Sequence, residues 1–214
     1  MTAMALLPSG TTLRGRFVHL APVVADDLPA LARILAEPAV YASGFVMWGR
    51  PPGPAAALDL ARRLYLHPPA PDGDGRGRVA YAVRLAGASA LGDAGEVVGT
   101  TSLGEAFLAH ERLHLGWTLY HPRVWGGVVN PEAKYLLLRH CFEDLGFGRV
   151  KLQTDALNTR SAAAIERLGA QREGVLRRHT RREDGSFRDT VVFSVVADDW
   201  PRVRDGLLAR LPAR

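Results

Sequence analysis

A pair of adjacent glycines stands where a strand-like apolar segment gives way to a strongly helical one, within residues 121–134. Gly126 and Gly127 let the backbone turn without a Cβ penalty. Asn130 is a good N-cap, and Pro131 suits the first helical position. The unpaired N–H groups at such a helix start stabilise an anion such as a pyrophosphate. The segment therefore predicts a phosphate-binding loop, although any turn from strand to helix also needs glycine and a cap.

A second motif, His110-Glu111-Arg112-Leu113-His114, matches the H-E-x-x-H pattern of zinc peptidases. In that pattern two histidines on one helical face share a metal and the glutamate is the general base. The context favours a hairpin loop that happens to spell the motif, because residues 116–118 continue it as a strand. The extended metzincin form also lacks its third ligand here, since Trp117 and Tyr120 occupy its glycine and histidine positions. A zinc peptidase is kept as an alternative.

Polar residues also mark the start of a shorter predicted helix, residues 158–168. Ser161, Ile165 and Leu168 recur at helical spacing and share one face, which places the Ser161 side chain inward among apolar neighbours. Asn158 caps this helix. The hydroxyl of Ser161 either bonds locally or is held at a site.

The composition limits the class of protein. With 214 residues and 47% hydrophobic content the chain can form one well-packed domain, and no apolar run approaches the length of a membrane span. Cys141 is the only cysteine, which excludes an intramolecular disulfide and fits a reducing cytoplasm. The first twelve residues lack the pattern of a signal peptide. The net charge of +5 suits phosphate-bearing partners but discriminates poorly, because arginine supplies nearly all of it.

The elements that must position these residues follow from the periodicity of the chain. Strands are expected at residues 17–22, 78–85, 96–103, 113–120, 149–155, 170–179 and 187–196, and helices at residues 26–38, 55–66, 130–145, 158–168 and 200–211. The strand–helix–strand order over residues 113–155 predicts two parallel neighbours joined right-handedly. The glycine turn then lies at the carboxyl end of the first strand, where ligands of open α/β sheets bind. Residues 41–54, which include Phe45, Met47 and Trp48, are expected as an irregular loop that lines a substrate entrance or packs over the core.

Three features together resemble the GNAT superfamily of acetyl-coenzyme A-dependent N-acetyltransferases. They are the order of elements, the turn Arg123-Val124-Trp125-Gly126-Gly127-Val128 with Asn130-Pro131-Glu132-Ala133-Lys134 after it, and Asn158-Thr159-Arg160-Ser161. More narrowly, the chain resembles the branch that contains the ribosomal-protein alanine acetyltransferases RimJ and RimL. The resemblance covers residues 13–211, and it implies an α+β fold whose mixed central sheet splays between two parallel strands and is flanked by helices. Residues 13–214 then form a single domain after a tail of residues 1–12.

The resemblance implies that acetyl-coenzyme A inserts where the two parallel strands splay. Its thioester would lie near residues 115–117, where a backbone N–H stabilises the oxyanion of the tetrahedral intermediate. The implied cofactor-binding residues are Leu115, Trp117, Arg123, Trp125, Gly126, Gly127, Val128 and Asn130, with Asn158 on the pantetheine arm. From its place beside the predicted cofactor helix, we expect Arg160 near the 3′-phosphate. The family ends its loop on glycine or alanine, whereas Val128 cannot easily take a positive φ, so we expect an unusual loop path there.

The catalytic roles also come from the resemblance. Many members protonate the departing thiolate with a tyrosine, whose position Ile165 occupies here. Ser161 lies one helical turn earlier on the same face and is implied as general acid, with a bound water as the alternative. The attacking amine must lose a proton, so a base is needed nearby. His114 is the first choice and Glu105 the second, unless each is an ordinary strand or loop residue.

The sequence therefore predicts a cytoplasmic N-acetyltransferase that transfers acetyl from acetyl-coenzyme A to a primary amine by direct attack in a ternary complex, without a metal. A protein N-terminus is one candidate acceptor. Coenzyme A and the amine are the expected partners, a homodimer is left open, and neither a membrane nor a nucleic acid is required. The second alternative, besides the zinc peptidase, is a non-catalytic basic module that binds RNA or the ribosome. The cluster Arg177, Arg178, Arg181 and Arg182 either steers an acidic substrate or forms a solvated strand end.

Overall fold

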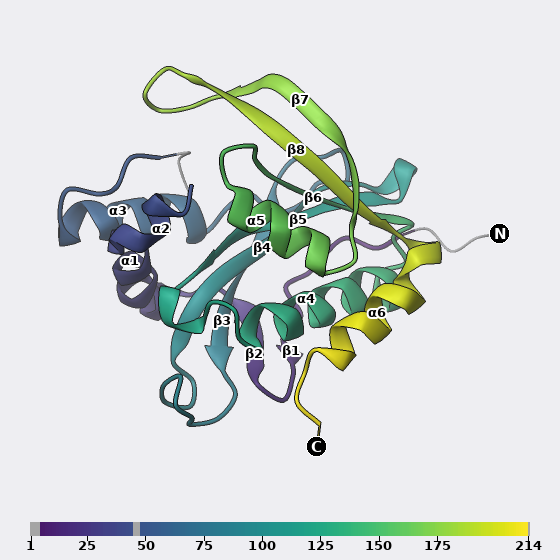
Figure 1. Ribbon diagram of the computed structural model, residues 1–214, viewed down its shortest axis with the longest axis horizontal. Helices are drawn as coiled ribbons and strands as arrows, with labels where there is room; N and C mark the ends of the chain where they lie inside the picture. The colour runs from purple at the N-terminus through teal and green to yellow at the C-terminus, as the bar shows by residue number, and fades with distance from the viewer. Residues whose placement is uncertain (1–4, 45–47, 214) are drawn as a thin grey trace.

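The computed structural model describes residues 5–44 and 48–213, which build an eight-stranded sheet between two layers of helices (Figure 1). The strand order is β1-β2-β3-β4-β5-β6-β8-β7, and β5 and β6 are the parallel pair in an otherwise antiparallel sheet. The strands are β1 (Leu13–Arg14), β2 (Val18–Pro22), β3 (Arg78–Leu85), β4 (Val97–Phe107), β5 (Arg112–Tyr120), β6 (Arg149–Asp155), β7 (Gln171–Arg181) and β8 (Phe187–Val196). The predicted mixed sheet with one parallel pair is confirmed.

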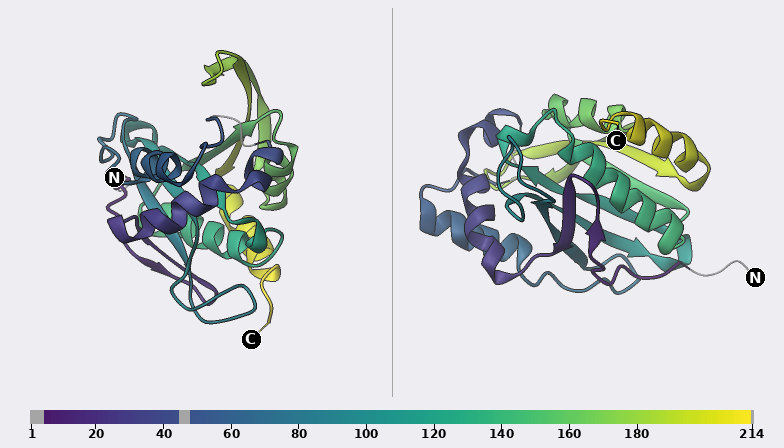
Figure 2. Two further views of the ribbon diagram at one scale, coloured as in Figure 1. Left: turned by 90° about the vertical axis from the view of Figure 1, so that its left-hand side faces the viewer. Right: turned by 90° about the horizontal axis from the view of Figure 1, so that it is seen from below.

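Helices cover both faces of the sheet. They are α1 (Leu28–Ala36), α2 (Pro38–Ala42), α3 (Pro54–Tyr65), α4 (Val129–Arg139), α5 (Thr159–Arg167) and α6 (Trp200–Ala209). Buried residues of α1 and α3 form one apolar cluster against the sheet, and those of α4, α5 and α6 form the larger cluster on the other side. The β7–β8 hairpin extends beyond these layers (Figure 2). Among the described residues, no helix is both long and apolar enough to cross a membrane.

The predicted helix over residues 130–145 is confirmed in its extent, but its cap and its last part differ from the prediction. The α-helix begins at Val129 with Val128 as its N-cap, so Asn130 and Pro131 lie inside the first turn instead of at the cap and the first position. Proline is tolerated there because the first four N–H groups of a helix have no intrahelical partner. Beyond Arg139 the chain continues as a π-helix, His140–Asp144.

The N-terminal half departs from the prediction in smaller ways. Residues 26–27 lie in a 3₁₀ turn (Ala25–Asp27), and α1 follows it. Part of the predicted loop over residues 41–54 is taken by the end of α2, while Trp48 packs against the cluster beneath α1 and α3. Phe45 and Met47 lie outside the described residues. Ala5 is buried in the larger cluster, so the described part of the predicted tail packs on the domain.

The parallel strands separate soon after they meet. β5 pairs with β6 only from Arg112 to His114, which is opposite Lys151, although both strands continue further. Register shifts interrupt the β4–β5 ladder on both sides of this point, and Glu105 and Trp117 take positive φ values of 48° and 50°. Strained backbone and bulges of this kind are common next to functional sites. The splay between β5 and β6 is therefore the place to look for the site.

Candidate active site

The glycine loop reaches α4 through a 3₁₀ turn, Pro122–Val124. Gly126 takes the positive φ of 75°, whereas Val128 has φ −75° and ψ −19°, ordinary helical angles. Val128 therefore avoids the positive φ that a valine cannot easily adopt, because the turn is made two residues earlier. No side chain in the described part of the chain caps α4. Its first N–H groups and its positive dipole end can stabilise an anion in the loop.

The loop is joined to the start of α5 by two side chains. The Trp125 indole donates a hydrogen bond from Nε1 to the carbonyl of Tyr120 at 3.0 Å. The guanidinium carbon of Arg160 lies 3.3 Å from the centroid of the same indole. Burial lowers the pKa of Arg160. The structure thus brings together the predicted pyrophosphate loop and the predicted cofactor helix.

At the start of α5, the carboxamide of Asn158 serves as the cap. Its Oδ1 accepts a hydrogen bond from the Ser161 backbone N–H at 2.9 Å. The Ser161 side chain is half-buried, and Ile165 one turn later is buried. The predicted cap at Asn158 is confirmed, while the roles of Asn158 and Ser161 toward a ligand stay predictions.

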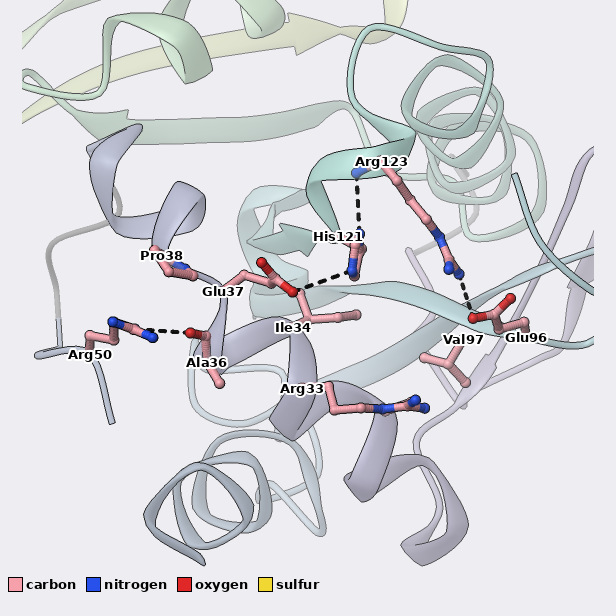
Figure 3. A pocket seen from close by; sticks show the side chains of 11 residues that line it. Arg33, Ile34, Ala36, Glu37, Pro38, Arg50, Glu96, Val97, His121 and Arg123 are labelled. Carbon is pink, nitrogen blue, oxygen red and sulfur yellow. Dashed lines mark hydrogen bonds and ion pairs between the residues drawn. The ribbon is translucent and has the colours of Figure 1, made fainter. Parts of the chain in front are cut away.

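Arg123 turns away from the glycine loop into a pocket of about 430 Å³ beside α1 (Figure 3). Its Nη2 lies 2.5 Å from Glu96 Oε1 in an ion pair. Nε2 of His121 lies 3.6 Å from Glu37 Oε1. The same Arg123 donates its backbone N–H to His121 Nδ1 at 3.2 Å. Arg123 therefore orders the turn before the loop, and a direct contact of its side chain with the cofactor stays a prediction.

The two candidate bases are neighbours at the splay. Nδ1 of His114 lies 3.3 Å from Glu105 Oε1, and Lys151 donates a hydrogen bond to Glu105 Oε2. The His114 side chain is only 4% exposed, whereas Glu105 keeps 35% of its side chain exposed. Burial lowers the pKa of His114, against the opposing influence of Glu105. Burial raises the pKa of Glu105, but contacts with His114 and Lys151 outweigh this and lower it to about 2.

The His114 ring is fixed by its neighbours on the strand. It packs against the Trp117 indole with centroids 4.6 Å apart, and Arg78 lies over the indole at 4.8 Å. A Cβ on Gly116 would stand 2.4 Å from His114 Nε2. Only glycine leaves room for the imidazole at this position.

The geometry of the zinc-peptidase motif contradicts that alternative. His110 ends a short 3₁₀ turn, Glu111 adopts the left-handed conformation with φ 46°, and His114 lies inside β5. His110 is exposed and His114 is buried, so the two rings do not share a helical face. Within residues 5–44 and 48–213, no three His, Cys, Asp or Glu side chains could hold a metal ion.

Sequence reasoning missed a buried polar network beneath the splay. Lys134 of α4 is 4% exposed, and its Nζ donates hydrogen bonds to the hydroxyls of Thr101 at 3.0 Å and Thr118 at 2.7 Å. Burial lowers the pKa of Lys134 to about 7. The available signal was the rarity of lysine, because Lys134 and Lys151 are the only two in the chain and both lie at the site.

The arginine cluster near the β7–β8 turn does not form one surface. Arg182 is largely buried and donates two hydrogen bonds to Asp155 Oδ2, at 2.6 and 3.1 Å. Arg178 and Arg181 lie over the ring of Phe187. Arg182 thus ties the hairpin to β6, and Arg178 and Arg181 pack on β8, which accounts for these three side chains without a bound partner.

Comparisons with known proteins agree with this geometry. The acetyltransferase (GNAT) domain family matches residues 18–171. A crystal structure from T. thermophilus, classed as an acetyltransferase, is 39% identical, with 97% of this chain and 100% of that chain covered and a TM-score of 0.79. The uncharacterized N-acetyltransferase YoaA of Bacillus subtilis is 28% identical over 104 residues, which are 49% of this chain and 58% of that protein.

The RimJ protein of Mycobacterium smegmatis, crystallised with CoA-disulfide, has the same fold. It is 21% identical, with 94% of this chain and 95% of that chain covered and a TM-score of 0.68. Several other structural relatives are described only as acetyltransferases, so the likeness to RimJ does not fix the branch. Neither the peptidase nor the non-catalytic RNA-binding alternative is supported by these comparisons.

Proposed function

We propose that this chain, which belongs to the acetyltransferase (GNAT) domain family, transfers acetyl from acetyl-coenzyme A to a primary amine. The observation that carries the proposal is the separation of β5 from β6 beyond His114 and Lys151, beside the starts of α4 and α5. An opening in a sheet exposes backbone N–H and C=O groups that an extended ligand can pair with. The starts of the two helices add donors for its phosphates.

In this proposal the pyrophosphate lies on the amides of residues 125–130, and Arg160 reaches the 3′-phosphate. Asn158 faces the pantetheine arm. Its Oδ1 accepts the cap hydrogen bond from Ser161, so the side-chain NH₂ group remains as a donor to the arm. The thioester then lies near residues 115–117. Direct attack by the amine forms a tetrahedral intermediate, whose oxyanion needs a donor from this part of β5.

The departing thiolate needs a proton, for which Ser161 is the proposed donor. The half-buried hydroxyl stands at the first turn of α5, and the buried Ile165 supplies no proton from the position of the family's tyrosine. A hydroxyl is a weak acid, so its contribution depends on passing a proton on from water.

His114 is the proposed base. Its lowered pKa keeps the imidazole neutral at pH 7, which is the form that accepts a proton. Because the ring is almost fully buried, a proton from the amine would reach it through a water molecule or across Glu105, whose side chain is partly exposed. The carboxylate of Glu105 then stabilises the imidazolium that forms.

The proposed acceptor is a protein N-terminal amine, as in the RimJ/RimL branch, and the proposed location is the cytoplasm. The resemblance of residues 117–178 to that branch supports the acceptor, and the single cysteine of the chain supports a reducing compartment. Substrate choice depends on the loops around a shared scaffold, so the acceptor has to be found by experiment.

Calorimetry with acetyl-coenzyme A, followed by a thiol-release screen, tests the proposal. The screen compares N-terminal peptides, polyamines and aminoglycosides as acceptors. We expect binding well below millimolar ligand and thiol release with at least one peptide. Absence of binding at millimolar acetyl-coenzyme A would overturn the proposed function.

A further inference from the structure

Four polar contacts connect Lys134 to the backbone of β5. Lys134 Nζ donates to the hydroxyls of Thr101 and Thr118. These two hydroxyls lie 2.9 Å apart, and Thr101 Oγ1 donates to the carbonyl of Gly116 at 3.3 Å. Thr101 is fully buried, and the network lies between α4 and the sheet.

The proton positions in this network follow from counting donors. A carbonyl only accepts, so the single hydroxyl proton of Thr101 must point at Gly116. Thr118 must then donate to Thr101, and Nζ of Lys134 donates to both hydroxyls. A single arrangement therefore satisfies all four contacts, and in it every hydrogen bond leads toward the Gly116 carbonyl.

The Gly116 carbonyl belongs to the same peptide unit as the Trp117 N–H. The described chain has no cis peptide bond, so this N–H points away from the carbonyl and hence away from Thr101. β4 is the neighbour of β5 on one side and β6 on the other, and β6 has already separated at this position. Withdrawing charge through a carbonyl makes the N–H of the same peptide a stronger donor, as in any chain of hydrogen bonds.

We propose that Lys134 is a positioning residue that acts through Thr101 to polarise the Gly116–Trp117 peptide, whose N–H stabilises the oxyanion of acetyl transfer. The inference rests on the proposed function, because it assigns the oxyanion donor of that reaction. Lys134 touches neither the thioester nor the amine. It fixes the bulge of β5 and supplies the two N–H donors that start the hydrogen-bond chain.

Packing alone does not account for a lysine at this position. Its neighbours on α4, among them Ala133, Leu137 and Leu138, are buried and apolar. Burying an ammonium group is costly, and a methionine of similar length would fill the space without that cost. The contacts to the two hydroxyls direct the amino group at a bulged segment of β5 that borders the splay.

Two substitutions break the chain at different links, and a third is a matched control. Lys134→Met removes the amino group that starts the chain of hydrogen bonds, and Thr101→Val removes the hydroxyl that donates to the Gly116 carbonyl. Thr100→Val makes the same change at the adjacent, equally buried position, where the hydroxyl has no hydrogen-bond partner among the described residues. Thermal unfolding of each variant shows whether the fold is kept.

The test measures the carbonyl stretch of bound acetonyl-coenzyme A, a stable ketone analogue, labelled with ¹³C at the carbonyl. In the wild-type protein and in Thr100→Val we expect the same shift to lower frequency. In Thr101→Val the carbonyl frequency should be lowered by less than in the wild type. In Lys134→Met the shift should also be reduced, but by a smaller amount than in Thr101→Val. We also expect kcat to fall about three- to tenfold in both variants while KM for acetyl-coenzyme A changes less than about twofold, because polarisation modulates the donor without removing it.

The outcomes separate the inference from the function on which it rests. If the three variants bind the analogue with the wild-type frequency and kcat, the inference is overturned and the acetyltransferase activity stands. An equal loss in Thr100→Val would also overturn it, since the effect would then belong to any substitution in β4. Failure of the wild-type protein to bind the analogue and to release thiol would overturn the proposed function, and the inference with it.

Discussion

Arg160 lies over the ring of Trp125, with the guanidinium carbon 3.3 Å from the centroid of the indole. The contact links the first turn of α5 to the glycine loop before α4, the two segments in which the cofactor site was predicted. A guanidinium stacked on an aromatic ring keeps its edge N–H groups available for a phosphate. The structure thus presents a cation beside the loop.

Arg160→Ala should weaken coenzyme A binding and remove the preference for the 3′-phosphate. A charge-assisted contact with phosphate corresponds to about a tenfold change in affinity. We expect calorimetry to give a wild-type dissociation constant about tenfold higher for 3′-dephospho-coenzyme A than for coenzyme A, and a ratio near one in the variant. Arg167→Ala, an exposed arginine on the same helix, is the matched control. A preserved ratio in Arg160→Ala would assign the 3′-phosphate to another residue.

Ser161→Ala should lower kcat by about tenfold or more, since general acid catalysis contributes at least that much where no water replaces the donor. Coenzyme A affinity should stay within about a factor of two, because the cap of α5 uses the backbone N–H of Ser161 and not its hydroxyl. Pre-steady-state thiol release and calorimetry measure the two quantities separately. Thr159→Ala removes an exposed hydroxyl from the same turn and serves as control. Unchanged turnover in Ser161→Ala would assign the proton to water.

The parts of the fold that follow from local rules could be predicted from the sequence. Apolar periodicity placed the strands and helices, and the strand–helix–strand order gave the parallel pair β5 and β6. The cap at Asn158 was predicted because its side chain serves the backbone three residues on. Asn130 has the same residue type but caps nothing, because the path of the glycine loop starts the helix at Val129.

The site needed contacts that no local rule supplies. Lys134 meets Thr101 and Thr118 only because α4 crosses the sheet at the bulge between β4 and β5. Glu105 meets Lys151 because β5 and β6 pair in one register and no other. A shift of one residue would turn either side chain to the opposite face of the sheet. Registers and bulges depend on the packing of the whole domain, which the sequence specifies only collectively.

The pH dependence of kcat/KM should identify the base. If His114 is the base, activity falls as pH drops through a value below 6.5, because burial lowers the pKa of this group and the protonated ring cannot accept a proton. Glu105→Gln removes an influence that raises the pKa of His114, so the acid limb should move to lower pH, with a smaller loss of activity than in His114→Gln.

His114→Gln tests the same assignment from the other side, since it should abolish the acid limb and lower kcat/KM by about a hundredfold. With Glu105 as base, its pKa of about 2 would leave activity level down to about pH 4. In that case Glu105→Gln, and not His114→Gln, would cause the large loss. Initial rates between about pH 4 and pH 9, with the fold checked at each pH, decide between the two residues.

Lys134 should make the wild-type protein more stable as the pH rises above neutrality. Its pKa is lowered by burial from 10.5 to about 7 in the folded state, so between these values the unfolded chain binds more protons than the folded one. The free energy of unfolding then increases with pH, by up to about 1.4 kcal/mol per pH unit.

For a chain of this size that increase corresponds to about 3 °C in Tm for each pH unit. Lys134→Met lacks this group. The difference in free energy of unfolding between the variant and the wild type should therefore favour the variant most at or below about pH 7 and shrink by about pH 9.5. Thr100→Val should show the same dependence of Tm on pH as the wild type. If Lys134→Met showed that dependence too, Lys134 would have to stay protonated throughout this range.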